Sequence, residues 1–172
     1  LVQQFEAIWP DGGLATHRAA SEALYRIKDR AFALIARRLR ENVPTTEYDI
    51  QSAMMTWFGG EGLVTDAAPI VASQENAGDP HYLPTARRSR PIRKGELVLL
   101  DLWGKKKENP QAVYADITWV GFTGPEVPLE MARAFGAIGQ ARDAAVALVQ
   151  ESARQQRDLR RRESCRGSRR QA

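Results

Sequence analysis

Two aspartates interrupt two of the most apolar segments of the chain. Asp101 lies in ELVLLDLWG and Asp116 lies in AVYADITWVGF, and the polar stretch GKKKENPQ lies between these two predicted strands. Both segments are apolar at odd and at even positions, which predicts central strands that are buried on both faces. An unpartnered carboxylate in such surroundings costs several kcal/mol, so each aspartate needs hydrogen-bond donors, a counterion or a metal.

A hairpin around the polar stretch would make the two aspartates neighbours. If Asp101 faces Asp116, Gly104 closes the loop opposite Val113. In that register both carboxylates lie on one face with Cβ atoms about 4.5–5.5 Å apart, where like charges share a proton or bind a cation. A divalent metal is one solution. Backbone amides or an arginine beside each aspartate are the alternative.

Two helices are predicted before the hairpin. Apolar residues at helical spacing predict an amphipathic helix over about residues 16–41, capped at Thr16, whose other face is basic and solvated. Pro44 breaks this helix, and Thr45 or Thr46 caps a second one that ends at a Gly-Gly pair. The apolar stripe of the second helix, interpreted as core rather than as a binding surface, comprises Ile50, Met54, Trp57 and Phe58.

The segments around the hairpin complete the predicted organisation. TDAAPIVAS is typical of a short strand, and QENAGDPHYLPTARRSRPIRKG of a long irregular loop, a kind of segment that is often functional or disordered. A third helix opens at Pro128 and runs to about Ser152. The order helix, helix, small antiparallel sheet, helix predicts an α+β fold.

Composition narrows the class of protein. The chain has 172 residues, of which 43% are hydrophobic and 27% charged, as expected for one globular domain. No apolar run reaches the roughly 18 residues that cross a bilayer, and the first residues do not resemble a signal peptide, so we expect a cytoplasmic protein with no membrane partner. Cys165 is the single cysteine, which excludes a disulfide framework and a thiolate metal site. Because the sequence opens on Leu1, a preceding segment is also expected.

The basic charge is concentrated at the end of the sequence. Residues 153–172 contain eight arginines against Asp158 and Glu163, whereas residues 1–152 are slightly acidic. We therefore divide the chain into a domain, residues 1–152, and a basic tail, residues 153–172, that is disordered or out of frame. The tail has no aromatic stacking platform, so the sequence does not favour nucleic acid as a partner.

Three segments in a fixed order resemble a known family. PIVASQENAGDPHYLPT, GELVLLDLWG and VYADITW resemble the first half of the pita-bread metallopeptidases, which include methionine aminopeptidase, Xaa-Pro aminopeptidase, prolidase and creatinase. NAGDPHY and YADIT are most similar to the Xaa-Pro branch. The resemblance extends over about residues 16–150. It implies the N-terminal half of a pita-bread fold, with helices packed on a small antiparallel sheet.

The resemblance also implies roles for individual residues. Members of the family hold two divalent metal ions, here Mn²⁺, Co²⁺ or Zn²⁺, with two aspartates, a histidine and two glutamates. Asp101 matches the first aspartate and Asp116 the one that bridges both ions. Thr118 matches a hydroxyl beside the bridging carboxylate, and His81 matches a catalytic histidine that lines the substrate pocket. The implied activity is metal-assisted hydrolysis of the first peptide bond of a peptide with a free N-terminus, with proline second in the Xaa-Pro branch.

The sequence departs from the family after the hairpin. No histidine follows Asp116, and the later glutamates lack the family's motifs, so three of the five metal ligands are missing. We therefore expect a chain that is inactive alone, in which the reading frame is lost near residues 151–158 or the gene is a remnant. Surfaces that a second half would cover are expected to cause homo-oligomerisation or aggregation. The alternative is a non-catalytic pita-bread module that binds peptides or proteins.

Overall fold

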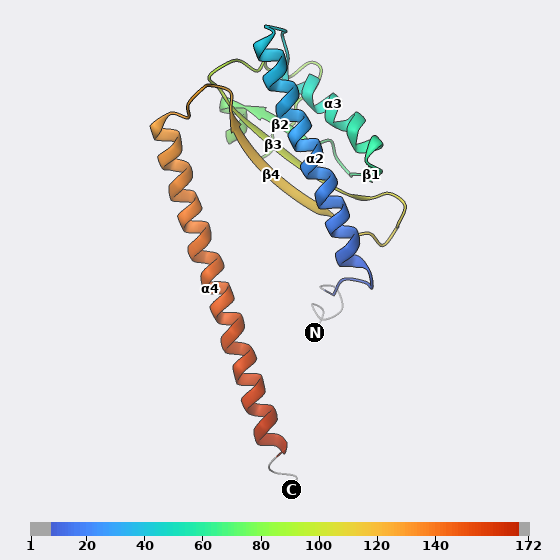
Figure 1. The fold of residues 1–172 in the computed structure, drawn as a ribbon, viewed down its shortest axis with the longest axis vertical. Coiled ribbons are helices and arrows are strands. Elements are labelled where there is room, and N and C mark those ends of the chain that lie inside the picture. Colours follow the sequence, from blue (N-terminus) through green and yellow to red (C-terminus); the bar gives the residue numbers. More distant parts are fainter. Residues whose placement is uncertain (1–7, 169–172) are drawn as a thin grey trace. The chain divides into compact units, whose positions relative to one another are not determined.

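The computed structural model describes residues 8–168, with side chains described as far as residue 156. The chain forms two compact units, Leu1–Pro125 and Glu126–Ala172. The first unit carries both aspartates and consists of two helices packed on a small antiparallel sheet (Figure 1). This arrangement confirms the predicted α+β fold.

Helix α2, Gly13–Arg40, supplies one wall of the core. It begins earlier than predicted, because Gly12 is the N-cap residue and adopts a left-handed conformation with φ 77°. The prediction that Thr16 caps the helix is therefore wrong. The Thr16 hydroxyl lies inside the first turn and donates to the carbonyl of Gly13 at 2.9 Å, a bond that threonine can make within a helix. The fully buried residues of α2 recur at helical spacing and are Ala20, Ala23, Leu24, Ile27 and Ala31.

Helix α3, Glu47–Gly60, begins at one of the two predicted caps. The side chain of Thr46 accepts a hydrogen bond from the amide of Asp49 at 3.2 Å, and Asp49 accepts one from the amide of Thr46 at 2.8 Å. This capping box satisfies two amides that the first turn leaves free. It also fixes the position of Glu47, the first residue of the helix. The apolar side chains that α3 buries are Ile50, Met54 and Phe58.

Strand β3, Leu97–Lys106, pairs with every other strand of the sheet. It pairs antiparallel with β2, Ile70–Ser73, and with β4, Ala115–Phe122, so the predicted hairpin is confirmed. It also pairs with β1, Leu63–Val64, a two-residue strand that the sequence pattern did not predict.

The two faces of the sheet differ in burial. Val98, Leu100 and Leu102 are 0% exposed and belong to one apolar cluster with residues of α2 and α3. On the opposite face, Asp101 is half-buried and Asp116 is exposed. The prediction that both strands are buried on both faces is therefore wrong for the part of the chain that the structure describes. Helices cover one face, and an antiparallel sheet tolerates solvent on the other.

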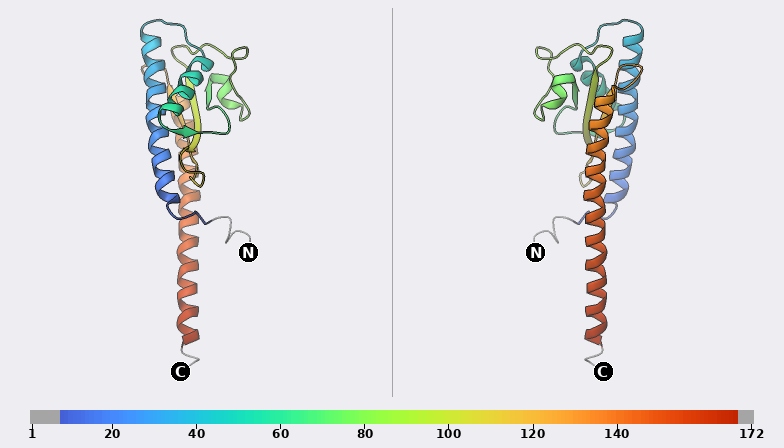
Figure 2. Two further views of the ribbon diagram at one scale, coloured as in Figure 1. Left: turned by 90° about the vertical axis from the view of Figure 1, so that its right-hand side faces the viewer. Right: turned by 90° about the vertical axis from the view of Figure 1, so that its left-hand side faces the viewer.

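The predicted long loop runs from residue 74 to residue 95 and lies on the face that the helices leave open. It begins with the 3₁₀ helix η1, Gln74–Gly78. Figure 2 shows η1 and α2 on opposite sides of the sheet. The end of the loop returns to α3, where Pro91 forms an isolated β-bridge with Thr46. The loop is therefore tied to the helical side of the molecule at its far end.

The second unit contains helix α4, Leu129–Ser168. The helix continues beyond the predicted end near Ser152, so the backbone of residues 153–168 is helical. The division of the chain at residue 152 and the origin of the tail stay predictions. Within residues 8–168, no helix combines the length and the apolar character that a membrane span needs. The predicted apolar stripe of α4 is largely solvent-exposed and includes Phe135, Ile138, Leu148 and Val149.

Candidate functional site

The structure places Asp101 and Asp116 on the same face of the hairpin, but not directly opposite each other. Asp101 pairs with Thr118, and Asp116 pairs with Trp103, so the register differs from the predicted one by two residues. A shift of two residues keeps every side chain on its face, because the side-chain period of a strand is two. The two aspartates are thus diagonal neighbours, a relation that places residues about 7–8 Å apart, with the Cβ atoms somewhat closer, whereas directly opposite residues have Cβ atoms about 4.5–5.5 Å apart.

The shift originates in the loop that joins the two strands. Gly104 pairs with Ala115, whereas the predicted register paired it with Val113. The amide of Val113 instead donates to Thr16 Oγ1 at 3.2 Å, and the carbonyl oxygen of the next residue, Tyr114, lies 2.8 Å from a ring nitrogen of His17. Contacts with the start of α2 therefore hold residues 113–114 outside the hairpin.

The two carboxylates have different surroundings. Thr118, which was expected beside Asp116, donates its hydroxyl hydrogen to Asp101 Oδ1 at 2.6 Å. Desolvation, and after it the negative charge of Asp101, raise the pKa of Asp116 above its usual value. The two aspartates thus repel each other across the hairpin, and a bound cation would relieve that repulsion.

A hollow of about 300 Å³ opens beside Asp101. Asp101 and Thr118 lie on the sheet side of the hollow, and residues 76–80 of the loop form the other side. The loop therefore stands over the face that carries the aspartates. A concave site with apolar walls and a few polar groups is the usual form of a small-ligand site.

His81 immediately follows two residues that line this hollow, Asp79 and Pro80. The amide of His81 donates to Asp79 Oδ1 at 2.9 Å, and the His81 side chain is exposed. The next residue, Tyr82, is 2% exposed. The structure thus brings the segment around His81 to the edge of the hollow beside Asp101. The catalytic role of its imidazole stays a prediction.

The donor chemistry of the site fits a divalent cation in part. Carboxylate oxygens such as those of Asp101 and Asp116 suit Mn²⁺, Co²⁺ and Zn²⁺. In the part of the chain that the structure describes, however, no group of three or more His, Cys, Asp or Glu side chains is placed to hold a metal ion. The described residues therefore supply two carboxylates for a metal site, which is fewer than a complete centre requires.

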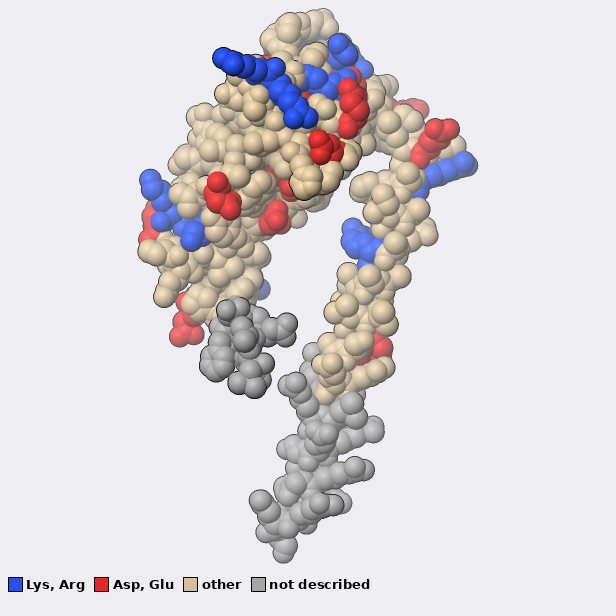
Figure 3. Space-filling model, turned by 180° about the vertical axis from the view of Figure 1, so that it is seen from behind, with Lys and Arg blue, Asp and Glu red and all other residues tan. Residues whose placement is uncertain are grey.

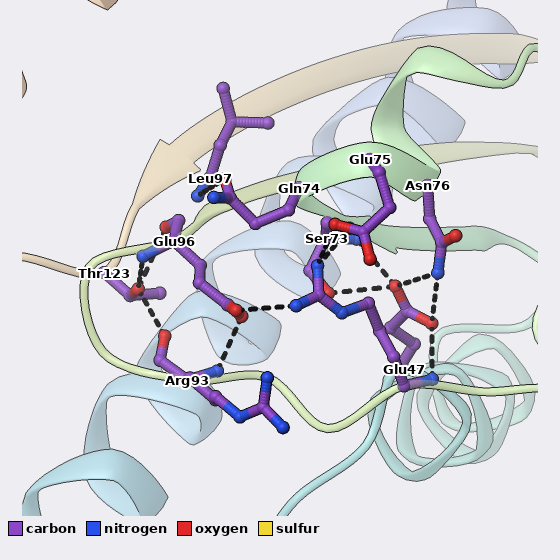
Figure 4. A network of polar contacts seen from close by, with 10 residues as sticks. Glu47, Ser73, Gln74, Glu75, Asn76, Arg93, Glu96, Leu97 and Thr123 are labelled. Carbon is purple, nitrogen blue, oxygen red and sulfur yellow. Dashed lines mark hydrogen bonds and ion pairs between the residues drawn. The ribbon is translucent and has the colours of Figure 1, made fainter.

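A fully buried carboxylate, which the sequence pattern did not reveal, lies beneath the loop. Glu47 is 0% exposed, and Figure 4 shows it among the polar groups of Ser73 and Asn76. It also accepts hydrogen bonds from the Tyr82 hydroxyl and from the Arg90 amide. Burial alone would raise the pKa of Glu47, but these hydrogen bonds outweigh it and lower the pKa below its usual value. In the sequence, a glutamate in the first turn of a helix is ordinary, because it favours the helix dipole.

Comparisons with known proteins agree with this architecture. The model of metallopeptidase family M24 matches residues 18–160. A prolidase from Thermococcus sibiricus is similar over 84% of the chain, with a TM-score of 0.62 and 21% identity. An X-Pro aminopeptidase from Thermotoga maritima MSB8 is similar over 83% of the chain, with a TM-score of 0.63 and 22% identity. A dipeptidase from Pyrococcus horikoshii OT3 is similar over 84% of the chain, with a TM-score of 0.62 and 26% identity.

These matches are partial for the other proteins. The chain spans 36% of the length of the prolidase and 37% of the length of the other two. The search of curated proteins found no significant match to the chain. The matched structures confirm the resemblance to the pita-bread fold, and the family model covers most of the sequence. The chain therefore belongs to metallopeptidase family M24.

Proposed function

We propose that the chain is part of the catalytic domain of a two-metal aminopeptidase that hydrolyses the N-terminal peptide bond of peptides. The observation that carries this proposal is the placement of Asp101 and Asp116 on one open sheet face, with Asp101 lining a hollow. Membership of family M24 supports a peptidase function. The similarity to a prolidase and an X-Pro aminopeptidase supports a substrate of the Xaa-Pro type with a free N-terminus.

Each site residue has a role in this proposal. Asp101 and Asp116 are two of the five ligands to a pair of divalent ions, Mn²⁺, Co²⁺ or Zn²⁺. Such ions lower the pKa of bound water and polarise a peptide carbonyl. Thr118 binds one oxygen of Asp101 and leaves the other oxygen for a cation. Residues 76–80, which line the hollow, form the wall along which the end of the peptide lies. His81, the next residue, contacts the scissile peptide in this proposal.

We also propose that the chain by itself has no peptidase activity. Two carboxylates alone bind a divalent ion weakly and do not hold a catalytic pair of ions. Purified chain incubated with Mn²⁺ and an Xaa-Pro peptide is therefore expected to release no N-terminal residue above a metal-only blank. Peptide hydrolysis that disappears in Asp116→Asn would show that the chain is active and would contradict this part of the proposal.

The alternative function is a non-catalytic pita-bread module that binds peptides or proteins. The absence of a three-ligand group within the described residues favours it. Titration with Mn²⁺, Co²⁺ and Zn²⁺ separates the two functions. Binding that is lost in Asp101→Asn and in Asp116→Asn, but kept in Asp143→Asn, supports the peptidase site, because Asp143 is an exposed aspartate on α4. Peptide binding that survives the double substitution of Asp101 and Asp116 supports the module instead.

Other properties of the chain follow from the proposed class. We place the chain in the cytoplasm, and we propose self-association or aggregation through the exposed surface that the second half of the fold would cover. Figure 3 shows basic and acidic side chains scattered among uncharged ones on one face of the described residues. Nucleic acid is not favoured as a partner, because residues 153–172 contain no aromatic side chain on which bases could stack. Salt-sensitive DNA binding that disappears when residues 153–172 are deleted would contradict that last point.

A further inference from the structure

We infer that Glu47 is a positioning residue, whose buried carboxylate sets where the loop of residues 74–90 stands over Asp101. The inference rests on the proposed function for the role of His81, which the loop carries. The anchoring of the loop is independent of that function, because it follows from the contacts of Glu47.

The carboxylate of Glu47 is surrounded by donors from four places in the chain. Oε1 accepts hydrogen bonds from the Ser73 amide at 2.7 Å, from the Ser73 hydroxyl at 2.9 Å and from the Asn76 amide group at 3.0 Å. Oε2 accepts hydrogen bonds from the Arg90 amide at 3.0 Å and from the Tyr82 hydroxyl. These donors replace the water that a buried carboxylate loses, and without them the burial would be costly.

The donors mark out the course of the loop. Ser73 ends β2, Asn76 belongs to η1, Tyr82 follows His81, and Arg90 lies where the loop returns to α3. The contact with Arg90 is reciprocal, because the amide of Glu47 also donates to the carbonyl of Arg90 at 3.1 Å. One side chain thus ties the loop at its start, its middle and its end.

The loop depends on such ties because it contains little regular structure. Ordering each residue of a chain costs about 1–2 kcal/mol of backbone entropy, which a helix or sheet offsets with its own hydrogen bonds. After η1, the loop has a turn in which Thr85 and Arg88 exchange hydrogen bonds, and few other backbone bonds of its own. The guanidinium of Arg90 adds ion pairs with Glu75 and Glu96. These pairs hold the edge of the loop, whereas Glu47 reaches its middle.

The anchoring reaches the candidate site through two residues. Asn76 donates to Glu47 and also lines the hollow beside Asp101. Tyr82 donates to Glu47 and is bonded in the chain to His81. If the carboxylate is lost, both the wall of the hollow and the backbone of His81 lose their fixed position. Glu47 thus acts on the site through Asn76 and Tyr82 rather than by contact with a ligand.

The test uses the full chain and compares Glu47→Gln with a matched control, Glu61→Gln. Glu61 also lies at an end of α3 and is hydrogen-bonded, but its partner is Arg26 on the surface of α2. Amide hydrogen exchange measured by NMR at Tyr82 and Arg90 reports on the loop, and exchange at Leu100 and Leu102 reports on the core. We expect exchange in the loop to be roughly tenfold faster in Glu47→Gln, with little change in the core or in the control.

A second measurement separates positioning from general stabilisation. Mn²⁺ bound at Asp101 and Asp116 broadens the NMR signals of nearby nuclei, so the wild-type chain should show broadening of the His81 imidazole. Glu47→Gln should lose most of this broadening while its Mn²⁺ affinity stays the same. Faster amide exchange in the loop with unchanged broadening of the His81 imidazole would mean that Glu47 has only a structural role, and would overturn the inference. Unchanged amide exchange in the loop would also overturn it.

The test also covers a Glu47→Gln variant that does not fold and a wild-type chain that binds no Mn²⁺. If Glu47→Gln does not fold, Tyr82→Phe removes one donor from the same carboxylate and is judged by the same criteria. If the wild-type chain binds no Mn²⁺, the proposed function fails, and exchange at Tyr82 and Arg90 then decides the anchoring alone. Faster exchange in the loop supports the anchoring in that case, and unchanged exchange overturns it.

Discussion

Leu99 and Leu100 are consecutive residues of β3 that point to opposite faces of the sheet, so truncating each to alanine measures how well each face is covered. Leu100 is 0% exposed and lies in the cluster formed with α2 and α3. Leu100→Ala should cost about 2–5 kcal/mol, because it loses transfer energy and leaves a cavity that the core cannot fill. Leu99 lines the open hollow, where water fills the vacated space. Leu99→Ala should therefore lower the free energy of unfolding by about 1–2 kcal/mol. This is part of the roughly 1.5–3 kcal/mol that complete burial of a leucine side chain contributes.

Urea unfolding followed by far-UV circular dichroism measures both changes. With a slope of about 1–3 kcal/mol per molar urea, a difference of about 2 kcal/mol between the variants separates their midpoints by roughly 1 M. Equal slopes would confirm that both variants unfold from comparable states. If Leu99→Ala costs as much as Leu100→Ala, the open face is buried in solution, for instance by a second copy of the chain. That result would refute the description of a sheet covered on one face.

Two further predictions concern the start of α3. Thr46→Ala removes the capping box with Asp49 and should lower the free energy of unfolding by about 1 kcal/mol, measured by thermal melting, and Thr56→Ala in the exposed part of the same helix serves as its control. The pKa of Glu47 is lower in the folded than in the unfolded chain, so its contribution to stability is complete above the unfolded pKa and is lost as the pH falls through the folded one. Stability should therefore decline on acidification below about pH 4.5, and less so in Glu47→Gln. Equal declines in both proteins would mean that other carboxylates, such as Glu75 and Glu96 beside Arg90, dominate acid unfolding.

Features determined by neighbouring residues could be predicted from the sequence. The cap at Thr46 depends on a residue three positions later, and the alternation around Asp101 and Asp116 is visible in each strand. The prediction that the two aspartates share a face was correct although the predicted register was wrong, because a shift of two residues leaves every side chain on the same face of the strand. Local pattern therefore located β3, β4 and the two carboxylates correctly.

Features determined by distant contacts could not be predicted. In the observed register the amide of Val113 donates to Thr16 of α2 instead of joining the hairpin, and strand patterns contain no information on that partner. The role of Glu47 depends on donors from residues 73–90, so its first-turn position indicated only a favourable helix charge. The open face was missed for a similar reason, because the apolar residues of a strand do not show whether anything covers them.

The most direct test of the proposed function is to map where Mn²⁺ binds on the chain. In NMR spectra of the ¹⁵N-labelled protein, low Mn²⁺ concentrations should broaden the amide signals of Asp101, Asp116 and Thr118 first. Asp116→Asn should weaken this effect by at least about tenfold, because even the loss of a residue behind a metal ligand costs about 10–100-fold in affinity. Broadening centred elsewhere, or undiminished in Asp116→Asn, would contradict the assignment of the two aspartates as metal ligands.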